Sequence, residues 1–470
     1  MYVADSRANT ATTASVAGTA RPAPAGRYRT TIAPTVLALG TVSLVTDVSS
    51  EMVTAVLPLY LVAGLGLSPL GFGLLDGVYN GFSAVVRLAG GHLADRGGGR
   101  HKWVAGAGYA LSALCKPLLL IAHTLTPIGL ILAADRTGKG LRTAPRDALI
   151  SLSSTPGTRG RAFGVHRAMD TAGALLGPLA AFLILRATVD GYDAVFTVSF
   201  CVAVLGVLIL VLFVPGDGRA GAVPGVDRTK PVPDGDRTKP VPDRNRTKPV
   251  PDGDRTEASA PGARPAPAPR PAPRPTLRAA IGLLADRDLR RITVCALLLG
   301  LATVSDSFVY LLLQRRLGVP DRWFALLPLG TAAAFLLLAV PLGRLADRWG
   351  RWRVFLTGHA ALLLAYALLL TSWHGTALPY AVLALHGTFY AATDGVLMAA
   401  ASDSVPEALR SSGLALVQTG QAAARFACSL GFGAAWTLWG DRTALSVSAV
   451  ALAGCAAYAL TLRPLRKAAV

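Results

Sequence analysis

Charged residues are scarce in this sequence. Asp, Glu, Lys and Arg together make up 16% of the 470 residues, while hydrophobic residues make up 52%. Soluble domains hold about 25% charged residues on average, so this composition argues against a soluble protein. The apolar residues also gather into blocks of roughly 20, the length of helix that crosses a bilayer. We therefore expect a polytopic membrane protein.

Acidic residues are fewer than basic ones, 27 against 46, which gives a formal net charge of +19. In a soluble protein such an excess would favour nucleic acid as the partner. Here the bases cluster between particular apolar blocks, which indicates contact with the lipids of the cytoplasmic leaflet. No nucleic-acid partner is expected.

Cysteines are few, and nucleotide loops and metal motifs are missing from the sequence. The five cysteines lie inside apolar blocks without the spacing of a zinc site, so we interpret them as small packing residues. The sequence holds no Walker loop, no cluster of metal ligands and no catalytic constellation of a soluble enzyme. It therefore predicts neither an enzyme nor a cofactor, and it argues against ATP as the energy source.

Twelve apolar blocks predict twelve transmembrane helices in two groups of six. The first group is expected at 33–61, 69–92, 103–122, 125–146, 164–186 and 194–214. The second is expected at 291–313, 324–345, 353–372, 378–401, 411–438 and 443–463. The predicted fold class is an all-helical membrane protein with six-helix bundles at 32–214 and 278–463.

The remaining segments have compositions that do not form a packed core. Residues 1–31 lack the apolar core and cleavage site of a signal peptide, so we expect an uncleaved disordered tail, and 464–470 form a second tail. Residues 215–277 repeat DRTKPVPDG and end in APAPRPAPRP, which predicts a flexible cytoplasmic linker. Residues 277–291 predict an amphipathic helix on the membrane surface.

The short connections differ in charge, which predicts the orientation in the membrane. Those after the second, fourth and eighth helices hold several bases, while those after the first, third and ninth hold none. By the positive-inside rule both termini are expected in the cytoplasm. The frequent Ala, Arg, Gly and Pro suggest a bacterium with a high-GC genome, and hence its inner membrane.

One charged turn occurs twice. GGHLADRGGGRHK at 90–102 returns as LGRLADRWGRWRV at 342–354, and each copy carries Gly-x-x-x-Asp-Arg-x-Gly between two apolar helices. Recurrence at matching places indicates a duplicated architecture. The shared residues are Gly91, Asp95 and Arg96 in the first copy, and Gly343, Asp347 and Arg348 in the second.

Two groups of six helices, a central linker and this turn in both halves resemble the major facilitator superfamily over nearly the whole chain. The resemblance implies two pseudo-symmetric bundles around a cavity that opens alternately to each side of the membrane. It also implies that Asp95 faces the start of the eleventh helix near Ser411, and Asp347 the start of the fifth near Ala162. A carboxylate at a helix N-terminus is favoured by about 0.3 to 1 kcal/mol. These contacts would hold a cytoplasmic gate shut.

The fifth helix carries Gly164, Gly173, Gly177 and Pro178. They resemble the glycine and proline pattern of proton-coupled antiporters in this family. Small residues at such intervals let two helices approach closely, and a proline bends the helix. Phe182 departs from the pattern, which has a small residue there. Plain helix packing also explains Gly173 and Gly177.

Ionisable residues occur at membrane depth, where each costs about 2.5 to 3.5 kcal/mol, so they persist mainly in cavities, in pairs or in mechanisms. Asp47 and Glu51 are four residues apart and share one face of the first helix. Two carboxylates that close repel each other, which favours proton uptake. We predict a proton-coupling site here. The alternative is that Arg or Lys partners neutralise both carboxylates and only fix the helix.

Several bases could partner these carboxylates: Arg87 in the second helix, Lys116 in the third, and Arg136, Lys139 and Arg142 in the fourth. Arg136 is expected to face the cavity and to complete the coupling set with Asp47 and Glu51. Asp135 and Lys139, four residues apart, can satisfy each other.

Two polar groups lie near the predicted helix ends. Arg167 and Asp170 of the fifth helix form either a self-contained ion pair or, with His166, a pH-responsive gate. Asp76 and Asn80 share a face of the second helix and are expected at the cavity mouth.

The second half holds fewer ionisable groups. Its candidates for binding the substrate are Asp306, Tyr310, Tyr390, Asp394, Gln421 and Arg425. His386 is expected to be a satisfied core histidine. This asymmetry predicts that the first half handles protons while the second contributes more to cargo binding.

Strings at 46–52, 135–150 and 159–170 resemble a bacterial subgroup of the superfamily that is loosely grouped with drug efflux or siderophore transport. We therefore expect a monomeric secondary transporter that exchanges protons for a small organic or drug-like solute, in the direction of efflux. The first alternative is uptake of an anionic solute, such as a siderophore or another carboxylate, held by Arg87, Lys116, Arg136 and Lys139. A remote alternative is a sensor or scaffold that does not transport.

Overall fold

The computed structural model describes residues 33–96, 101–155, 158–189, 191–215, 282, 285–373, 375–394, 396–403 and 410–461. Its first half contains α1 (Pro34–Leu59), the π-helix η1 (Tyr60–Gly64), α2 (Pro69–Arg96), α3 (His101–Ile121), α4 (Leu125–Leu152), α5 (Arg159–Ala187) and α6 (Gly191–Phe213). The second half contains α9 (Arg287–Ala302), α10 (Asp306–Leu317), α11 (Asp321–Phe324), α12 (Leu327–Trp349), α13 (Arg351–Leu370), α14 (Leu378–Thr393), α15 (Val396–Asp403), α16 (Arg410–Trp439) and α17 (Asp441–Thr461). The predicted all-helical fold with twelve spans is confirmed.

Two spans that the sequence predicted as continuous helices are broken. The seventh consists of α9 and α10, and the tenth of α14 and α15. At the first break the backbone N–H of Val304 donates to the Tyr366 hydroxyl at 2.8 Å. Interrupted helices are tolerated at membrane depth where such side chains satisfy the freed backbone groups. The break places Asp306 in the first turn of α10.

Eight of the described helical segments are long and apolar enough to cross a membrane. Of the other spans, α4 carries the most charge and has three buried arginines, Arg136, Arg142 and Arg146. The protein interior, not lipid, surrounds these guanidinium groups, so α4 can stay in the membrane despite its polarity.

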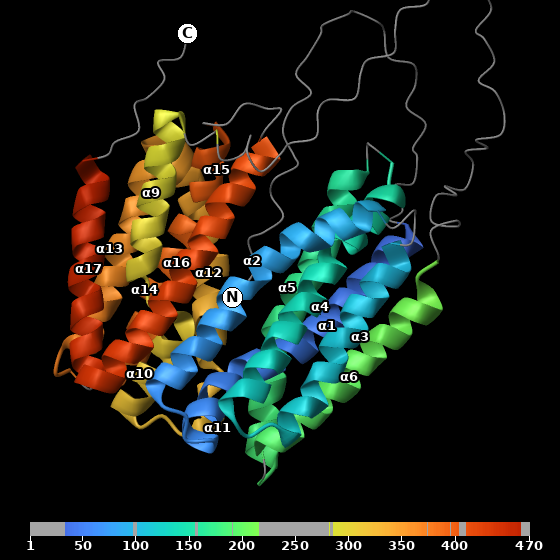
Figure 1. The fold of residues 1–470 in the computed structure, drawn as a ribbon, viewed down its shortest axis with the longest axis horizontal. Helices are drawn as coiled ribbons and strands as arrows, with labels where there is room; N and C mark the ends of the chain where they lie inside the picture. The colour runs from blue at the N-terminus through green and yellow to red at the C-terminus, as the bar shows by residue number, and fades with distance from the viewer. Residues whose placement is uncertain are drawn as a thin grey trace, which may run out of the picture.

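The helices form two groups that lie side by side (Figure 1). Helix α1 packs on α5 and α6, and α3 on α4; in the second half α14 packs on α12 and α13. The two ends of the molecule differ in charge. We call the end that holds the connections after α2, α4 and α12 the basic end, and the opposite end the far end.

The two halves meet closely between α2 and α16, along a surface that we call the seam. A Cβ added at Gly73 would lie 2.4 Å from the Ser429 carbonyl oxygen, and one at Gly433 would lie 2.4 Å from the Pro69 carbonyl oxygen. The backbone N–H of Leu70 also donates to Thr437 Oγ1 at 3.0 Å. Because α2 begins and α16 ends at the far end, these contacts close the cavity there.

The glycines of α5 confirm part of the expected packing. A Cβ at Gly173 would lie 2.4 Å from the Leu44 carbonyl oxygen, and one at Gly177 would lie 2.6 Å from Glu51 Cβ. Gly164, by contrast, is exposed and has no atom within 4 Å of the added Cβ. Close approach of α1 and α5 therefore accounts for two of these glycines, and Gly164 is the exception.

Contact between Asp347 and the start of α5 is not made in this conformation. The Asp347 side chain is 72% exposed, and its ion pair is with Arg351, one turn further on, at 3.9 Å. The halves are joined at the far end, which leaves Asp347 in solvent at the basic end. A role for Gly343, Asp347 and Arg348 in a closed gate remains a prediction.

Several predictions fall wholly or largely outside the described residues. They concern the tails at 1–31 and 464–470, residues 216–277 of the linker, and the side chains of Arg87, Gly91, Asp95, Arg96 and Ser411. Of the predicted surface helix at 277–291, residues 287–291 belong to α9.

Candidate functional site

A cavity lies between the two halves. It is lined from the first half by α1, α2, α4 and α5, and from the second by α10, α12, α14, α16 and the residues between α9 and α10. The predicted residues among its lining are Asp47, Glu51, Arg136, Lys139, Arg167, Asp170, Pro178, Asp306, Tyr310, Tyr390 and Arg425. Lys116, Asp394 and Gln421 do not line it, which corrects their predicted place in this conformation.

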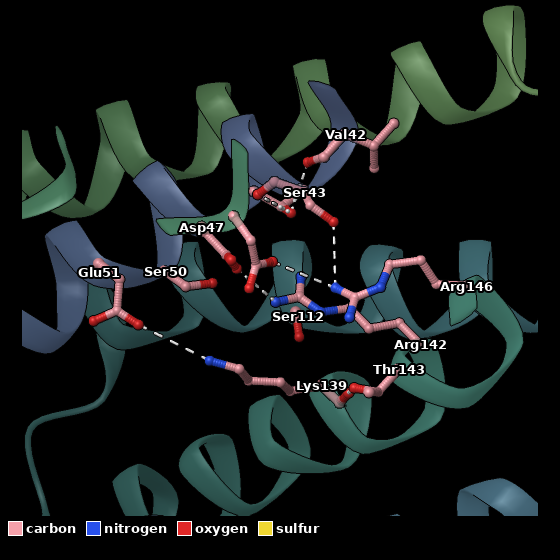
Figure 2. A network of polar contacts seen from close by, with 12 residues as sticks. Val42, Ser43, Asp47, Ser50, Glu51, Ser112, Lys139, Arg142, Thr143 and Arg146 are labelled. Atoms are coloured by element: carbon pink, nitrogen blue, oxygen red, sulfur yellow. Dashed lines mark hydrogen bonds and ion pairs between the residues drawn. The ribbon is translucent and has the colours of Figure 1, made fainter. Parts of the chain in front are cut away.

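The two carboxylates of α1 each face a base of α4 (Figure 2). Arg142 Nη2 lies 3.3 Å from Asp47 Oδ1, and Lys139 Nζ lies 3.9 Å from Glu51 Oε1. Both carboxylates still line the cavity, as the spacing of four residues predicted. Each carboxylate therefore has a cation partner in this conformation, as the alternative interpretation of the pair described.

The two ion pairs differ in their access to water. The side chains of Lys139 and Glu51 are 24% and 20% exposed, whereas those of Arg142 and Asp47 are 4% and 13% exposed. The Lys139–Glu51 pair is longer and more exposed to water, so it is the weaker of the two. A ligand or a proton therefore displaces this pair more easily than the Arg142–Asp47 pair.

Arg136 forms its ion pair with Asp135, its neighbour on the same helix. Its Nη2 and Nε lie 2.7 Å and 3.2 Å from Asp135 Oδ2, and its guanidinium carbon lies 3.8 Å from the Tyr79 ring centre. Lys116 Nζ lies 3.5 Å from the other oxygen of Asp135. Asp135 therefore pairs with Arg136 and Lys116, which corrects the predicted pairing of Asp135 with Lys139.

Sequence reasoning missed two residues beside Arg136. The Tyr79 hydroxyl and Thr54 Oγ1 are 2.6 Å apart, which joins α2 to α1 under the guanidinium group. Tyr79 lies three residues after Asp76 and so on the same side of α2, a spacing that could have drawn attention to it.

Asp170 links α4 to α5. It lies 3.6 Å from Arg167 of its own helix and 3.5 Å from Arg146 of α4, so its ion pair is not self-contained. Arg146 Nη1 also donates to Ser43 Oγ at 3.2 Å, and Ser43 Oγ lies 2.9 Å from His166 Nε2. The hydroxyl of Ser43 can donate to or accept from His166, according to the tautomer of the imidazole.

In the second half Asp306 is the centre of a smaller polar group. The Tyr390 hydroxyl donates to Asp306 Oδ1, and His386 Nε2 lies 3.4 Å from the same oxygen. His386 is fully buried, as expected of a core histidine, but neither of its ring nitrogens makes a hydrogen bond in the described part of the chain, so the expectation that it is satisfied is wrong. The Tyr310 hydroxyl donates to Thr331 of α12 at 3.0 Å. A carboxylate in the first turn of a helix is favoured in its ionised form, so Asp306 is suited to bind a cation in the cavity.

Comparison with known proteins decides the family. The sequence profile of the Major Facilitator Superfamily matches residues 39–429 and 292–469. The chain belongs to the major facilitator superfamily. It is therefore a multi-pass membrane protein of a transporter family whose members are not enzymes.

Two relatives are similar over part of their length. An uncharacterized MFS-type transporter of Methanocaldococcus jannaschii is 35% identical over 173 residues, which are 37% of this chain and 42% of that protein. An uncharacterized protein of Mycobacterium tuberculosis is 36% identical over 157 residues, which are 33% of this chain and 38% of that protein. The match thus spans less than half of either relative.

Solved structures share the fold at low identity. The nucleoside transporter NupG gives a TM-score of 0.70 at 12% identity, over 92% of this chain and 100% of that one. The peptide transporter POT in complex with sulfate gives 0.68 at 15% identity, over 92% and 94% of the two chains. A bacterial homologue of the human lysosomal transporter Spinster gives 0.66 at 14% identity, over 91% and 96%. At these identities the likeness extends to the fold alone.

Proposed function

We propose that this MFS transporter couples proton uptake to efflux of a small organic or drug-like solute. The supporting observation is that Asp47 and Glu51 line a cavity shared by both halves, where each pairs with a base of α4 in the same half, Arg142 or Lys139. When α1 and α4 shift against each other during the transport cycle and a base leaves its carboxylate, the neutral, protonated carboxyl becomes the favoured form at membrane depth. Proton binding and cavity reorientation are then coupled.

In this proposal Arg136 is a positioning residue. Its contacts with Asp135 and Tyr79 hold α4 and α2 in the register that presents Lys139 and Arg142 to α1. The antiporter-like Gly177 acts in the same way from the other side, because it lets α5 approach Glu51 closely.

The proposed setting is a bacterial inner membrane with both termini in the cytoplasm, and the proposed working unit is a monomer. The basic end is then cytoplasmic, and the conformation described above opens its cavity inward. Gly91, Asp95 and Arg96, together with Gly343, Asp347 and Arg348, would form the gate that closes this end, with Arg167 and Asp170 at its rim.

The test begins with the cargo. A thermal-shift screen of siderophores, antibiotics and organic acids across pH identifies a solute that raises the melting temperature. Flux of that solute under a pH gradient is then measured in proteoliposomes for Asp47→Asn combined with Glu51→Gln. We expect gradient-driven flux to be lost, whereas Asp193→Asn, an exposed carboxylate of α6, keeps it. Unchanged gradient-driven flux in the double variant would rule out coupling at these residues.

The second candidate is uptake of an anion, and one observation favours it. The cavity lining holds six bases, Arg136, Lys139, Arg142, Arg146, Arg167 and Arg425, and four acids, Asp47, Glu51, Asp170 and Asp306. Lys139→Gln separates the two candidates, because Lys139 is the exposed partner of the weaker ion pair. Loss of binding for anionic solutes with binding of cationic solutes spared would favour the anion.

A further inference from the structure

Asp76 of α2 is a buried acid outside the cavity lining. It is 6% exposed, and Ser429 Oγ of α16 donates to its Oδ2 at 2.7 Å. Ser305 and Ser307, on either side of the first residue of α10, face the same carboxyl, and Ser305 Oγ is buried without a hydrogen-bond partner among the described residues. The expected place at the cavity mouth is therefore wrong, because Asp76 lies in the seam where the second half presents three serines to it.

The groups that most strongly influence the charge of the Asp76 carboxyl include no cation. From α16 these are Ser429 and Cys428, and from the break between α9 and α10 they are Ser305, Ser307 and the Asp306 carboxylate. On α2 itself, Asn80 Nδ2 donates to the Asp76 backbone carbonyl at 2.9 Å. Among the described residues, no Lys, Arg or His forms an ion pair with Asp76.

A buried carboxylate without a cation is costly, and a second carboxylate nearby adds to the cost. A neutral carboxyl fits the same surroundings, because its carbonyl oxygen accepts from Ser429 while its O–H donates to a serine hydroxyl of the α9–α10 break. We infer that Asp76 is a proton-binding site of the seam, protonated when α2 and α16 close together and ionised when they part. This inference rests on the proposed proton coupling and adds a second site to it.

The seam explains how closure and protonation depend on each other. Gly73 and Gly77 bring α2 against Ser429 and Phe426, with the added Cβ atoms at 2.4 Å and 3.0 Å from α16 atoms, so water is excluded around Asp76. Closure therefore favours the protonated carboxyl. Parting of the helices at the far end hydrates the carboxyl, which then releases its proton. Ser305 and Ser307 also line the cavity, so the seam site lies next to it. One proton is thus bound on closure and released on parting in each cycle.

The test measures the opening of the seam directly and requires no transported solute. Spin labels are placed by Val189→Cys and Tyr380→Cys, which are 102% and 73% exposed and belong to opposite halves at the far end, in a chain whose five native cysteines are replaced. Distances between the labels are measured in lipid nanodiscs from about pH 5 to about pH 9, the range in which such a site can titrate. The open-to-closed ratio is expected to rise with pH, by at most about tenfold per pH unit for one linked proton.

Three variants decide the inference. Asp76→Asn should stay closed at every pH, whereas Asp193→Asn should respond as the parent does. Ser429→Ala leaves Asp76 in place but removes the hydrogen bond that the protonated carboxyl accepts in the closed seam, so the closed form is less favoured and the midpoint of opening should move to lower pH. Any of three results would overturn the inference. These are a wild-type label distance that does not change with pH, a response of Asp76→Asn like that of the parent, and an unchanged midpoint in Ser429→Ala. The Ser429→Ala result decides if Asp76→Asn fails to fold.

The same labels separate this inference from the proposed function. The double variant, Asp47→Asn with Glu51→Gln, should still show pH-dependent opening of the seam, even though its gradient-driven flux is lost. If that double variant keeps its coupled flux, the proposed coupling fails. If instead Asp76→Asn opens normally while the double variant loses flux, only the seam site fails.

Discussion

At the scale of single residues, Arg136 is the most constrained cation of the cavity. It is 2% exposed, bonded to Asp135 by two nitrogens and stacked on Tyr79. Removing one member of a buried ion pair costs about 3 to 5 kcal/mol, because the other charge is left behind. Lys116 remains beside Asp135 and lessens that loss.

We therefore expect Arg136→Gln to lower the free energy of unfolding by roughly 3 kcal/mol, at the lower end of that range. Lys139→Gln should lower it by less than about 1 kcal/mol, because the Lys139–Glu51 pair is long and partly hydrated. Denaturant unfolding in detergent, followed by tryptophan fluorescence, measures both. Equal losses in the two variants would contradict the assignment of Arg136 as the structural base.

The sequence predicted which residues belong to this site better than it predicted which residues they pair with. Charge at membrane depth pointed to Asp47, Glu51 and Lys139, and all three line the cavity. Which base meets which acid depends on the rotation and tilt of α4 against α1, and spacing along one helix does not set these. For this reason Lys139 pairs with Glu51 of another helix, although Asp135 lies one turn away on its own.

At the scale of elements, the contact between α1 and α5 depends on two glycines. Gly177→Ala would place a methyl carbon 2.6 Å from Glu51 Cβ and 2.9 Å from the Val48 carbonyl oxygen. Overpacking of this kind costs about 1 to 3 kcal/mol. We expect a lower melting temperature for Gly177→Ala and an unchanged one for Gly164→Ala, whose added methyl has open space. A comparable loss in both variants would count against close packing as the reason for Gly177.

The seam between α2 and α16 offers a second matched pair. Gly433→Ala brings a methyl carbon to 2.4 Å from the Pro69 carbonyl oxygen, whereas Gly431→Ala, on the same helix, has nothing within 4 Å. Because the seam joins the halves and not one bundle, Gly433→Ala should favour the conformation that is open at the far end. Maleimide labelling of Leu70→Cys should become faster in Gly433→Ala and not in Gly431→Ala. Equal labelling rates would show that the seam does not control access.

The helices themselves followed from the apolar blocks, and their ends agree with the sequence prediction to within a few residues at most positions. The two breaks did not follow. Thr303, Val304 and Ser305 interrupt the seventh span, although the sequence there is neither proline-rich nor glycine-rich. The Tyr366 hydroxyl of α13 satisfies the backbone of Val304, and a partner so far along the chain leaves no local signal.

At the scale of the whole molecule, closure at the far end is what orients the cavity. Leu70 N and Thr437 Oγ1 are 3.0 Å apart across the seam, so Leu70→Cys with Thr437→Cys should form a disulfide on oxidation. In a chain without other cysteines, this bond should stop solute flux, and reduction should restore it. Each single variant should transport in both redox states. Full flux in the oxidised double variant would mean that the seam need not open.

The account depends most on the claim that the carboxylates of α1 carry the coupled proton. Its most direct measurement is flux of the identified solute into or out of proteoliposomes, with and without a pH gradient, for the wild type and for Asp47→Asn with Glu51→Gln. We predict that the variant exchanges solute at equal pH but no longer moves it against a concentration gradient when a pH gradient is imposed. Gradient-driven accumulation at the wild-type level in that variant would contradict the claim.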